Sequence, residues 1–326
     1  MNPRVSIVIE AYNEEQNALA PPSETLQALR RQQFPLDQVE VVLVGSAEQI
    51  ECWNGLQFEF QGFGAVRLIA VDPSHSHYWE LKNQGAQAAS ANLLAFLDCD
   101  GLPAPSWLST LVSALESGAD VSIGPSQYRS SRLNADSAWM LAMALPSWSF
   151  TLSRTSSAKT PQPGSLMGHN LGIRRELLLQ HSFPTLPRSY GSSMLFFQLA
   201  RAGARLSYQP EQRVAHGFTF RWWLSRMHFR RGWETYEGRL SDPSWPRIPV
   251  LESMKYVEPL LLRTGLVARD ARHWFRFGRV LGLGSGRMVL LFPLALGASV
   301  AARMAEAAGM YAALLAPNTS ASQARF

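Results

Sequence analysis

Four stretches within the first 100 residues are almost entirely apolar, and a polar turn follows each of them. The apolar stretches are Val5–Ile9, Val39–Val44, Val66–Val71 and Leu93–Leu97. Continuous apolar runs of this length suit strands that are buried on both faces of a sheet. Helical patterns lie between and after them, around residues 24–31, 78–90 and 107–117. This alternation predicts an α/β fold, a mostly parallel sheet flanked by helices.

The pattern changes after about residue 220. Up to that point it continues with a short strand at 120–123, a helix at 192–202 that Gly203 ends, and a last strand that reaches His216. From Trp222 onward it consists of long helical stretches studded with arginines. We therefore expect a compact first domain over residues 1–225 and a basic, helical C-terminal region over residues 226–326.

One segment of the C-terminal region is strongly apolar. Met288–Ala302 lies between Arg287 and Arg303, and it includes Pro293 and Gly297. A helix needs about 20 apolar residues to cross a bilayer, and this run is shorter. The segment favours an interfacial or re-entrant helix over a span, and the alternative is a helix buried against the first domain.

Charge is divided unevenly along the 326 residues. Residues 1–200 hold 12 basic and 17 acidic side chains, whereas residues 201–326 hold 18 basic and 8 acidic ones together with five of the ten tryptophans. A basic, Trp-rich segment suits an anionic membrane surface, although a solvated basic face would have the same composition. No nucleic-acid-binding signature accompanies the charge, so nucleic acid is not an expected partner. With only two cysteines and no visible signal peptide, we expect a cytoplasmic protein, peripheral at the inner face of the membrane.

Two carboxylates stand directly after the fourth apolar stretch, at Asp98 and Asp100. The carboxyl ends of parallel strands are where open α/β sheets bind ligands. Acidic groups this close repel each other unless a cation lies beside them, and Mg²⁺ in particular is often shared between carboxylates and phosphates. The pair therefore indicates a divalent metal and a phosphorylated substrate. The alternative is a strand-ending Asp turn with no ligand.

Five segments, taken in order, resemble the family 2 glycosyltransferases, which have the Rossmann-related GT-A fold. They are the opening strand and turn at 5–14, Lys82-Asn83-Gln84-Gly85, Phe96–Asp100 with Pro105–Leu108, Gly168-His169-Asn170 with Ile173–Arg175, and residues 202–216 ending in His216. The resemblance covers residues 4–235. Each motif is short, and their order and spacing give the resemblance its weight.

The resemblance implies roles for particular residues. Asp100 would be the first ligand of a divalent metal (Mn²⁺ or Mg²⁺), Asp98 would contact the metal or the ribose, and His216 would add a ligand. The nucleotide-sugar site would be lined by Ala11, Tyr12, Asn13, Glu14, Lys82 and Asp98, and the acceptor side by Trp107, Gly168, His169 and Asn170. Lys82 could pair with a phosphate or with the pocket carboxylates, and the alternative from residue type is a solvated helix lysine. His216 could equally be a buried core histidine.

Two departures from the family pattern affect the expected mechanism. The second strand ends in Val44-Gly45-Ser46, where the family has a carboxylate that recognises the base. The family's catalytic acidic pair is replaced by Ser192-Ser193, and a serine hydroxyl is not a useful base near pH 7. His169 or Asp136 could substitute, but no spacing argument supports either, so the catalytic base is unknown.

The resemblance implies a metal-dependent glycosyltransferase. It would move a sugar from a UDP- or GDP-linked donor to a lipid-linked or polysaccharide acceptor, with inversion. The alternative is a catalytically silent binding or scaffold protein of the same fold, because of the two departures. A nucleotidyltransferase would need a Gly-rich phosphate loop after the first strand, and residues 10–17 offer none.

Overall fold

The computed structural model folds into two compact units, the first formed by residues 1–127 and 150–217 and the second by residues 128–149 and 218–326. The structure describes residues 2–11, 22–56, 58–72, 77–129, 137–148, 151–152, 162–185, 188–217, 219–241, 254, 256–279 and 283–316. The sequence suggested one boundary near residue 225. In the structure residues 128–149 belong to the second unit, although they precede much of the first unit in the chain.

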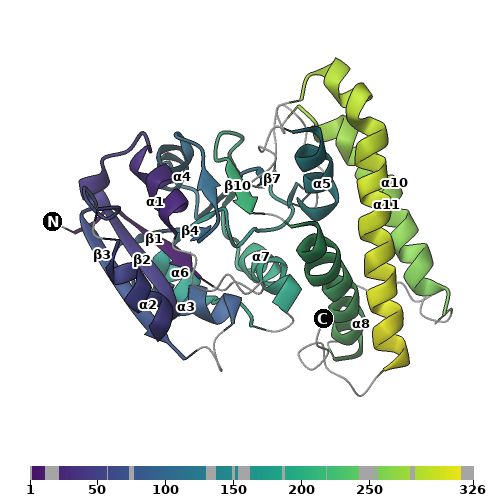
Figure 1. Ribbon diagram of the computed structural model, residues 1–326, viewed down its shortest axis with the longest axis horizontal. Helices are drawn as coiled ribbons and strands as arrows, with labels where there is room; N and C mark the ends of the chain where they lie inside the picture. The colour runs from purple at the N-terminus through teal and green to yellow at the C-terminus, as the bar shows by residue number, and fades with distance from the viewer. Residues whose placement is uncertain are drawn as a thin grey trace. The chain divides into compact units, whose positions relative to one another are not determined.

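A seven-stranded sheet in the order β3-β2-β1-β4-β8-β6-β9 forms the centre of the first unit (Figure 1). The strands are β1 (Val5–Glu10), β2 (Val39–Ser46), β3 (Ala65–Val71), β4 (Leu93–Asp98), β6 (Val121–Ile123), β8 (Leu171–Arg174) and β9 (Leu206–Tyr208). Only β8 runs against its neighbours among these strands. All six residues of β1 and all six of β4 are buried. The predicted mostly parallel sheet flanked by helices is confirmed.

Helices of the first unit cover both faces of this sheet. They are α1 (Ser23–Arg30), α2 (Ala47–Asn54), α3 (Tyr78–Ala88), α4 (Trp107–Glu116), α6 (Arg175–Gln180) and α7 (Gly191–Arg201), with short 3₁₀ turns η1 (Leu36–Gln38) and η3 (Arg188–Tyr190). Side chains alternate along a strand, so one set packs with α1, α2 and α4 in a shared core, while α3 lies on the other set. Gly203, with φ +78°, follows α7 as predicted.

A small three-stranded sheet in the order β5-β10-β7 brings distant segments to the end of β4. It consists of β5 (Leu102–Pro103), β10 (Val214–Gly217) and β7 (Ser126–Arg129). β10 runs antiparallel to β5, with Ala215 paired to Leu102. Because β5 follows Asp98 after a short turn, this pairing carries the end of β10 back to the carboxyl end of β4.

The second unit is helical. It contains α5 (Ala138–Trp148), the π-helical η4 (Trp222–Phe229), α8 (Arg230–Ser241), α10 (Glu258–Phe277) and α11 (Ser285–Leu315). In Figure 1 α10 and α11 lie side by side, and their ends are joined by hydrogen bonds from Tyr311 to the Tyr256 carbonyl and from Trp274 to the Met288 carbonyl. The two helices are therefore antiparallel. The predicted apolar segment lies within α11, which is 31 residues long and which is, among the described residues, the one helix long and apolar enough to cross a membrane.

Candidate functional site

Two buried carboxylates meet at the carboxyl edge of the central sheet. β1 and β4 are neighbouring parallel strands, and their register pairs Glu10 directly with Asp98. Both side chains are almost completely buried, at 1% and 6% exposure of the residue. Asp100 follows on the turn, with 47% of its side chain exposed. Glu10 was not among the predicted site residues, although its position at the end of a buried strand was the available signal.

Lys82 lies between these two buried carboxylates. Its Nζ is 2.7 Å from Asp98 Oδ1 and 3.7 Å from Glu10 Oε1, and the side chain has no exposed surface. A lysine that leaves water completely needs opposite charge beside it. Of the two interpretations of Lys82, the structure therefore shows the pairing with pocket carboxylates and not a solvated helix lysine.

Close packing of α3 explains how Lys82 reaches the sheet edge. A Cβ at Gly85 would lie 2.3 Å from Val8 Cγ1 and 3.0 Å from Val44 Cγ2. Only a glycine lets the helix approach β1 and β2 this closely. The glycine of the Lys-Asn-Gln-Gly segment thus sets the depth of α3, and Lys82 lies one turn before it.

Two further groups act on Asp98. The Tyr78 hydroxyl donates to Oδ1 at 2.9 Å, and His216 Nε2 lies 2.9 Å from Oδ2. Burial alone would raise the pKa of Asp98, but the charge of Lys82 and the hydrogen bond from His216 hold this pKa well below its usual value. Asp98 is therefore a carboxylate at neutral pH. No sequence signal pointed to Tyr78.

His216 lies close to both aspartates. Its Nε2 is 3.5 Å from Asp100 Oδ1 in addition to its contact with Asp98, while Nδ1 donates to the Gly217 carbonyl at 2.7 Å. Burial would lower the pKa of His216, but the charges of Asp100 and Asp98 raise it to about 10. A Cβ on Gly217 would lie 2.2 Å from Asp100 Oδ2, so a glycine here leaves room for that carboxylate.

His169 completes a cluster of three possible metal ligands. One ligand atom from each of Asp98, His169 and His216 lies within 4.8 Å of the others. Burial lowers the pKa of His169 to about 3, so its imidazole is neutral near pH 7, which is the form that binds a metal. A carboxylate oxygen with two imidazole nitrogens fits a divalent transition ion such as Mn²⁺ better than Mg²⁺, which prefers oxygen ligands. The sequence placed His169 on the acceptor side and gave no sign of its closeness to His216.

Three other predicted acceptor-side residues lie around His169. Trp107 and Asn170 are fully buried, and the indole Nε1 donates to Asn170 Oδ1 at 2.9 Å. Asn170 in turn donates to the carbonyls of Pro125 and Gln212. Gly168 is in close contact with α3, because a Cβ there would lie 2.7 Å from the Trp79 ring. Trp107 and Asn170 have no exposed surface, and their hydrogen bonds hold the backbone segment that carries His169.

The end of β2, where the family pattern has a carboxylate, leads into α2. Ser46 caps this helix, accepting from the Gln49 N–H at 3.2 Å and donating its own N–H to Gln49 Oε1 at 2.8 Å. Gln49 Nε2 also donates to the Ala11 carbonyl at 3.0 Å. A Cβ at Gly45 would lie 2.6 Å from Gln49 Oε1 and 2.9 Å from the Trp53 ring. α2 therefore leaves no room for a carboxylate side chain at position 45.

Serines also occupy the position of the usual catalytic acidic pair. Ser192 and Ser193 lie in the first turn of α7, and Ser193 Oγ is 3.0 Å from Ser165 Oγ. The other weak candidate for the base, Asp136, lies outside the described residues, as do Tyr12, Asn13 and Glu14 of the predicted nucleotide site. Ala11 is described, and its backbone N–H donates to the Val44 carbonyl.

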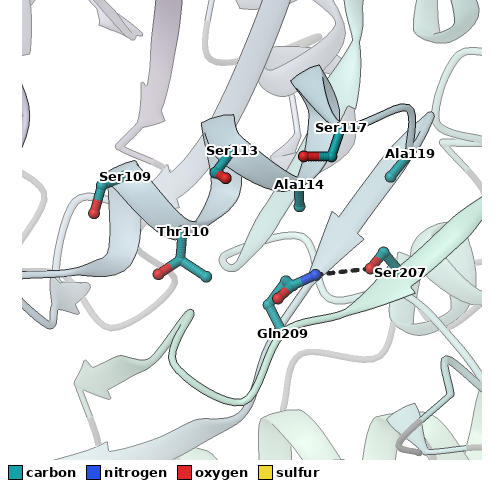
Figure 2. A pocket seen from close by; sticks show the side chains of 8 residues that line it. All are labelled: Ser109, Thr110, Ser113, Ala114, Ser117, Ala119, Ser207 and Gln209. Carbon is teal, nitrogen blue, oxygen red and sulfur yellow. Dashed lines mark hydrogen bonds between the residues drawn. The ribbon is translucent and has the colours of Figure 1, made fainter.

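A hollow of about 620 Å³ lies elsewhere on the first unit, over one side of α4 (Figure 2). It is lined by Ser109, Thr110, Ser113, Ala114, Ser117, Ala119, Ser207 and Gln209, and the Gln209 amide donates to Ser207 Oγ. None of these side chains is charged. The hollow thus has no charged side chain in its lining, unlike the cluster at the sheet edge.

Comparison with known proteins identifies the family. The family model described as glycosyl transferase family 2 matches residues 6–181, more than half of the chain. Glycosyltransferase AglE of Haloferax volcanii is 29% identical over 121 residues, which is 37% of this chain but only 38% of that protein. The glucosyl-dolichyl phosphate glucuronosyltransferase of the same organism is 21% identical over 270 residues, 75% of this chain and 79% of that protein.

A solved structure shows the same fold. The mannosyltransferase PcManGT from Pyrobaculum calidifontis, in complex with GDP-Man and Mn²⁺, superposes with a TM-score of 0.52 at 20% identity, covering 93% of this chain and 87% of its own. The predicted GT-A-like architecture and family are confirmed. The chain belongs to glycosyl transferase family 2 and is a hexosyltransferase-like enzyme.

Proposed function

We propose that this protein transfers a sugar from a nucleoside-diphosphate donor to a lipid-linked acceptor and that the transfer depends on a divalent metal. The observation that carries the proposal is the cluster of Asp98, His169 and His216 beside Asp100 at the carboxyl edge of the sheet. This is the edge where open α/β sheets bind nucleotides. The cluster places metal ligands beside the exposed carboxylate of Asp100.

The chain's own residues would prepare this site for an anionic donor. Asp98, His169 and His216 would hold the metal, with the exposed Asp100 as a further ligand. When bound, the metal would act as a Lewis acid that neutralises charge on the departing diphosphate. Lys82 keeps Asp98 ionised and fixed in place, because its Nζ lies 2.7 Å from Oδ1 in a fully buried position.

The names of the relatives support a class of donor and a class of acceptor for the proposed reaction. The structural neighbour is described with GDP-Man and Mn²⁺, which supports a nucleoside-diphosphate-sugar donor here. The relative that matches three quarters of this chain is named for a dolichyl phosphate substrate, which supports a lipid-linked acceptor. A lipid-linked acceptor would place the enzyme at a membrane, and we propose the cytoplasmic face.

For an inverting reaction, an acceptor oxygen would attack the anomeric carbon as the bond to the diphosphate breaks, and the acceptor proton would pass to a base. Ser192 and Ser193 cannot accept this proton alone. His169 is a weak base, since burial lowers its pKa to about 3. The base is thus still to be assigned, and Asp136 is the remaining weak candidate.

The test is a transfer assay with purified protein, a panel of UDP- and GDP-sugars, and polyprenyl phosphate or polyprenyl phosphate-sugar acceptors, with Mn²⁺ or with chelator. We expect a product that requires metal, and a loss of at least about 100-fold in Asp98→Asn, because even outer-shell changes at metal sites cost about 10–100-fold. Asp37→Ala, at an exposed carboxylate on η1, is the matched control and should keep full activity.

The same assay separates the alternative of a silent binding protein. Metal-dependent nucleotide binding without turnover of any donor would favour that alternative and overturn the proposed transfer. The anomeric configuration of a product, read by NMR, would show whether the reaction inverts.

A further inference from the structure

The outward side of α11 carries only apolar residues over most of its length. From residue 289 onward its exposed residues are Val289, Leu290, Pro293, Gly297, Val300, Met304, Ala308 and Leu315, which we call the α11 apolar face. Most of them recur every three or four residues, so they lie on one side of the helix. Leu290 is 77% exposed, Val289 67% and Met304 50%. On a surface helix of a water-soluble protein, large apolar side chains normally face the core.

The charged side chains of this part of α11 point into the second unit instead. Arg303 pairs with Asp270 at 2.8 Å and with Glu306 at 2.6 Å, and Arg263 pairs with Glu306 at 2.8 Å. All four residues are at most 6% exposed. α11 therefore has charges on its buried side and apolar residues on its outer side, the reverse of the arrangement that water selects.

Exposed arginines gather where α10 turns into α11. Arg272, Arg276 and Arg279 on and just after α10 and Arg287 on the first turn of α11 are all exposed, as is the aromatic Phe275. At the opposite end of the hairpin, Leu260 and Leu261 of α10 add exposed apolar surface. Arginines beside an apolar face suit anionic lipid headgroups, since each basic residue near such a surface contributes attraction.

We propose that the α11 apolar face lies in the interface of an anionic lipid bilayer, with the helix axis along the membrane plane and the arginines at the hairpin turn among the headgroups. The face is about 40 Å long at 1.5 Å per residue. Among the described residues, the other sides of α11 pack against α5, η4, α8 and α10 within the second unit, which leaves the α11 apolar face exposed. Lipid would then meet one side of α11, as it does for an interfacial helix.

This inference deepens the membrane localisation proposed above, and it can be tested without substrate. The full chain is mixed with phosphatidylcholine vesicles that contain or lack the anionic lipid phosphatidylglycerol, and binding is measured by flotation. We expect binding to the anionic vesicles that weakens as salt is raised. Leu290→Glu and Met304→Glu should each lower the partition coefficient at least tenfold. Phe58→Glu is the matched control, because Phe58 is 66% exposed on the first unit, and it should bind within twofold of the parent.

Spin labels test the orientation of the helix. In a chain with Cys52 and Cys99 replaced by Ala, nitroxides at positions 290 and 304 would lie about 21 Å apart along α11. Accessibility to oxygen and to a water-soluble nickel chelate should place both labels at similar, shallow depths.

Four results would overturn the proposal. Depths that differ by nearly the full separation of the two labels would mean that α11 crosses the bilayer. Labels that stay fully aqueous with vesicles, or equal loss of vesicle binding in Phe58→Glu, would mean that lipid does not cover this face. Labels shielded from both reagents in a lipid-free dimer would assign the face to a second copy. Failure of the transfer assay alone would leave this inference untouched, because the vesicles carry neither donor nor acceptor.

Discussion

Replacing Lys82 by Met removes an ammonium that lies between Asp98 and Glu10 while keeping a side chain of similar length. The Lys82 Nζ lies 4.5 Å from the centre of the Tyr78 ring and 5.8 Å from that of Phe96, so a methionine would still pack among these rings. The variant leaves two buried carboxylates 3.7 Å or less from the lost ammonium. Removing one partner of a buried ion pair costs about 3–5 kcal/mol. With an m-value of about 2–3 kcal/mol/M in urea, the unfolding midpoint should fall by about 1–2.5 M.

The assay is urea unfolding followed by circular dichroism at pH 8 and pH 5. The loss should shrink at pH 5, because a carboxylate without its lysine is freer to take a proton and so to lose its charge. Arg4→Met is the matched control: Arg4 pairs with Glu116 at 2.5 Å, but the two side chains are 44% and 40% exposed. An exposed pair contributes less than about 1 kcal/mol. A Lys82→Met midpoint that falls no further than that of Arg4→Met would refute the reasoning.

Three further predictions concern packing, metal binding and acid stability. Gly85→Ala should destabilise by about 1–3 kcal/mol through overpacking against the sheet, measured by urea midpoint, whereas Gly265→Ala, which has nothing within 4 Å of the added Cβ, should not. Because the carboxylates raise the pKa of His216 to about 10, a metal must displace the proton of this imidazole to bind. If one proton is released, the Mn²⁺ affinity measured by calorimetry should rise about tenfold per pH unit between pH 6 and 8. An affinity independent of pH would contradict this. Burial would raise the pKa of Glu40, but its hydrogen bonds, including one from Arg67, lower this pKa. The contribution of Glu40 to folding stability is therefore present above its unfolded pKa and is lost as pH falls through the lower folded value. Glu40→Gln should flatten the acid limb of the stability curve, and an unchanged limb would contradict this.

The sheet and its acidic edge could be read from the sequence because they depend on local pattern. A strand buried on both faces is apolar throughout, and the first polar residue after it marks the carboxyl edge, as at Asp98. Parallel neighbours end at the same edge, so the grouping of Asp98 with Glu10 follows from topology. His216 joined them through a family likeness, and the structure supplies the physical reason in the antiparallel pairing of β10 with β5.

The contact between His169 and His216 could not be read from the sequence. The two rings lie 4.8 Å apart, centre to centre, although the two residues are far apart in the chain. Their meeting depends on the buried network of Asn170 with Trp107 and Gln212, whose members come from three different parts of the fold. The sequence pattern predicts none of these long-range hydrogen bonds.

In the second unit, the sequence predicts helices but not how they pack together. Residues 138–148 form α5, which is apolar on nearly all sides and packs extensively with α11, near the other end of the chain. A sequence window cannot show which distant helix covers an apolar one. It also cannot show that Arg303 and Glu306 point inward, although this orientation is what leaves the outer side of α11 apolar.

The most direct test of the central claim is calorimetric titration of GDP and of UDP into the purified full chain, with Mn²⁺ and with chelator, alongside Asp98→Asn. If Asp98, His169 and His216 hold a metal that receives the donor diphosphate, at least one nucleotide binds with Mn²⁺, and both the chelator and the substitution abolish that binding. Equal binding with chelator, or unchanged binding in Asp98→Asn, would contradict the account.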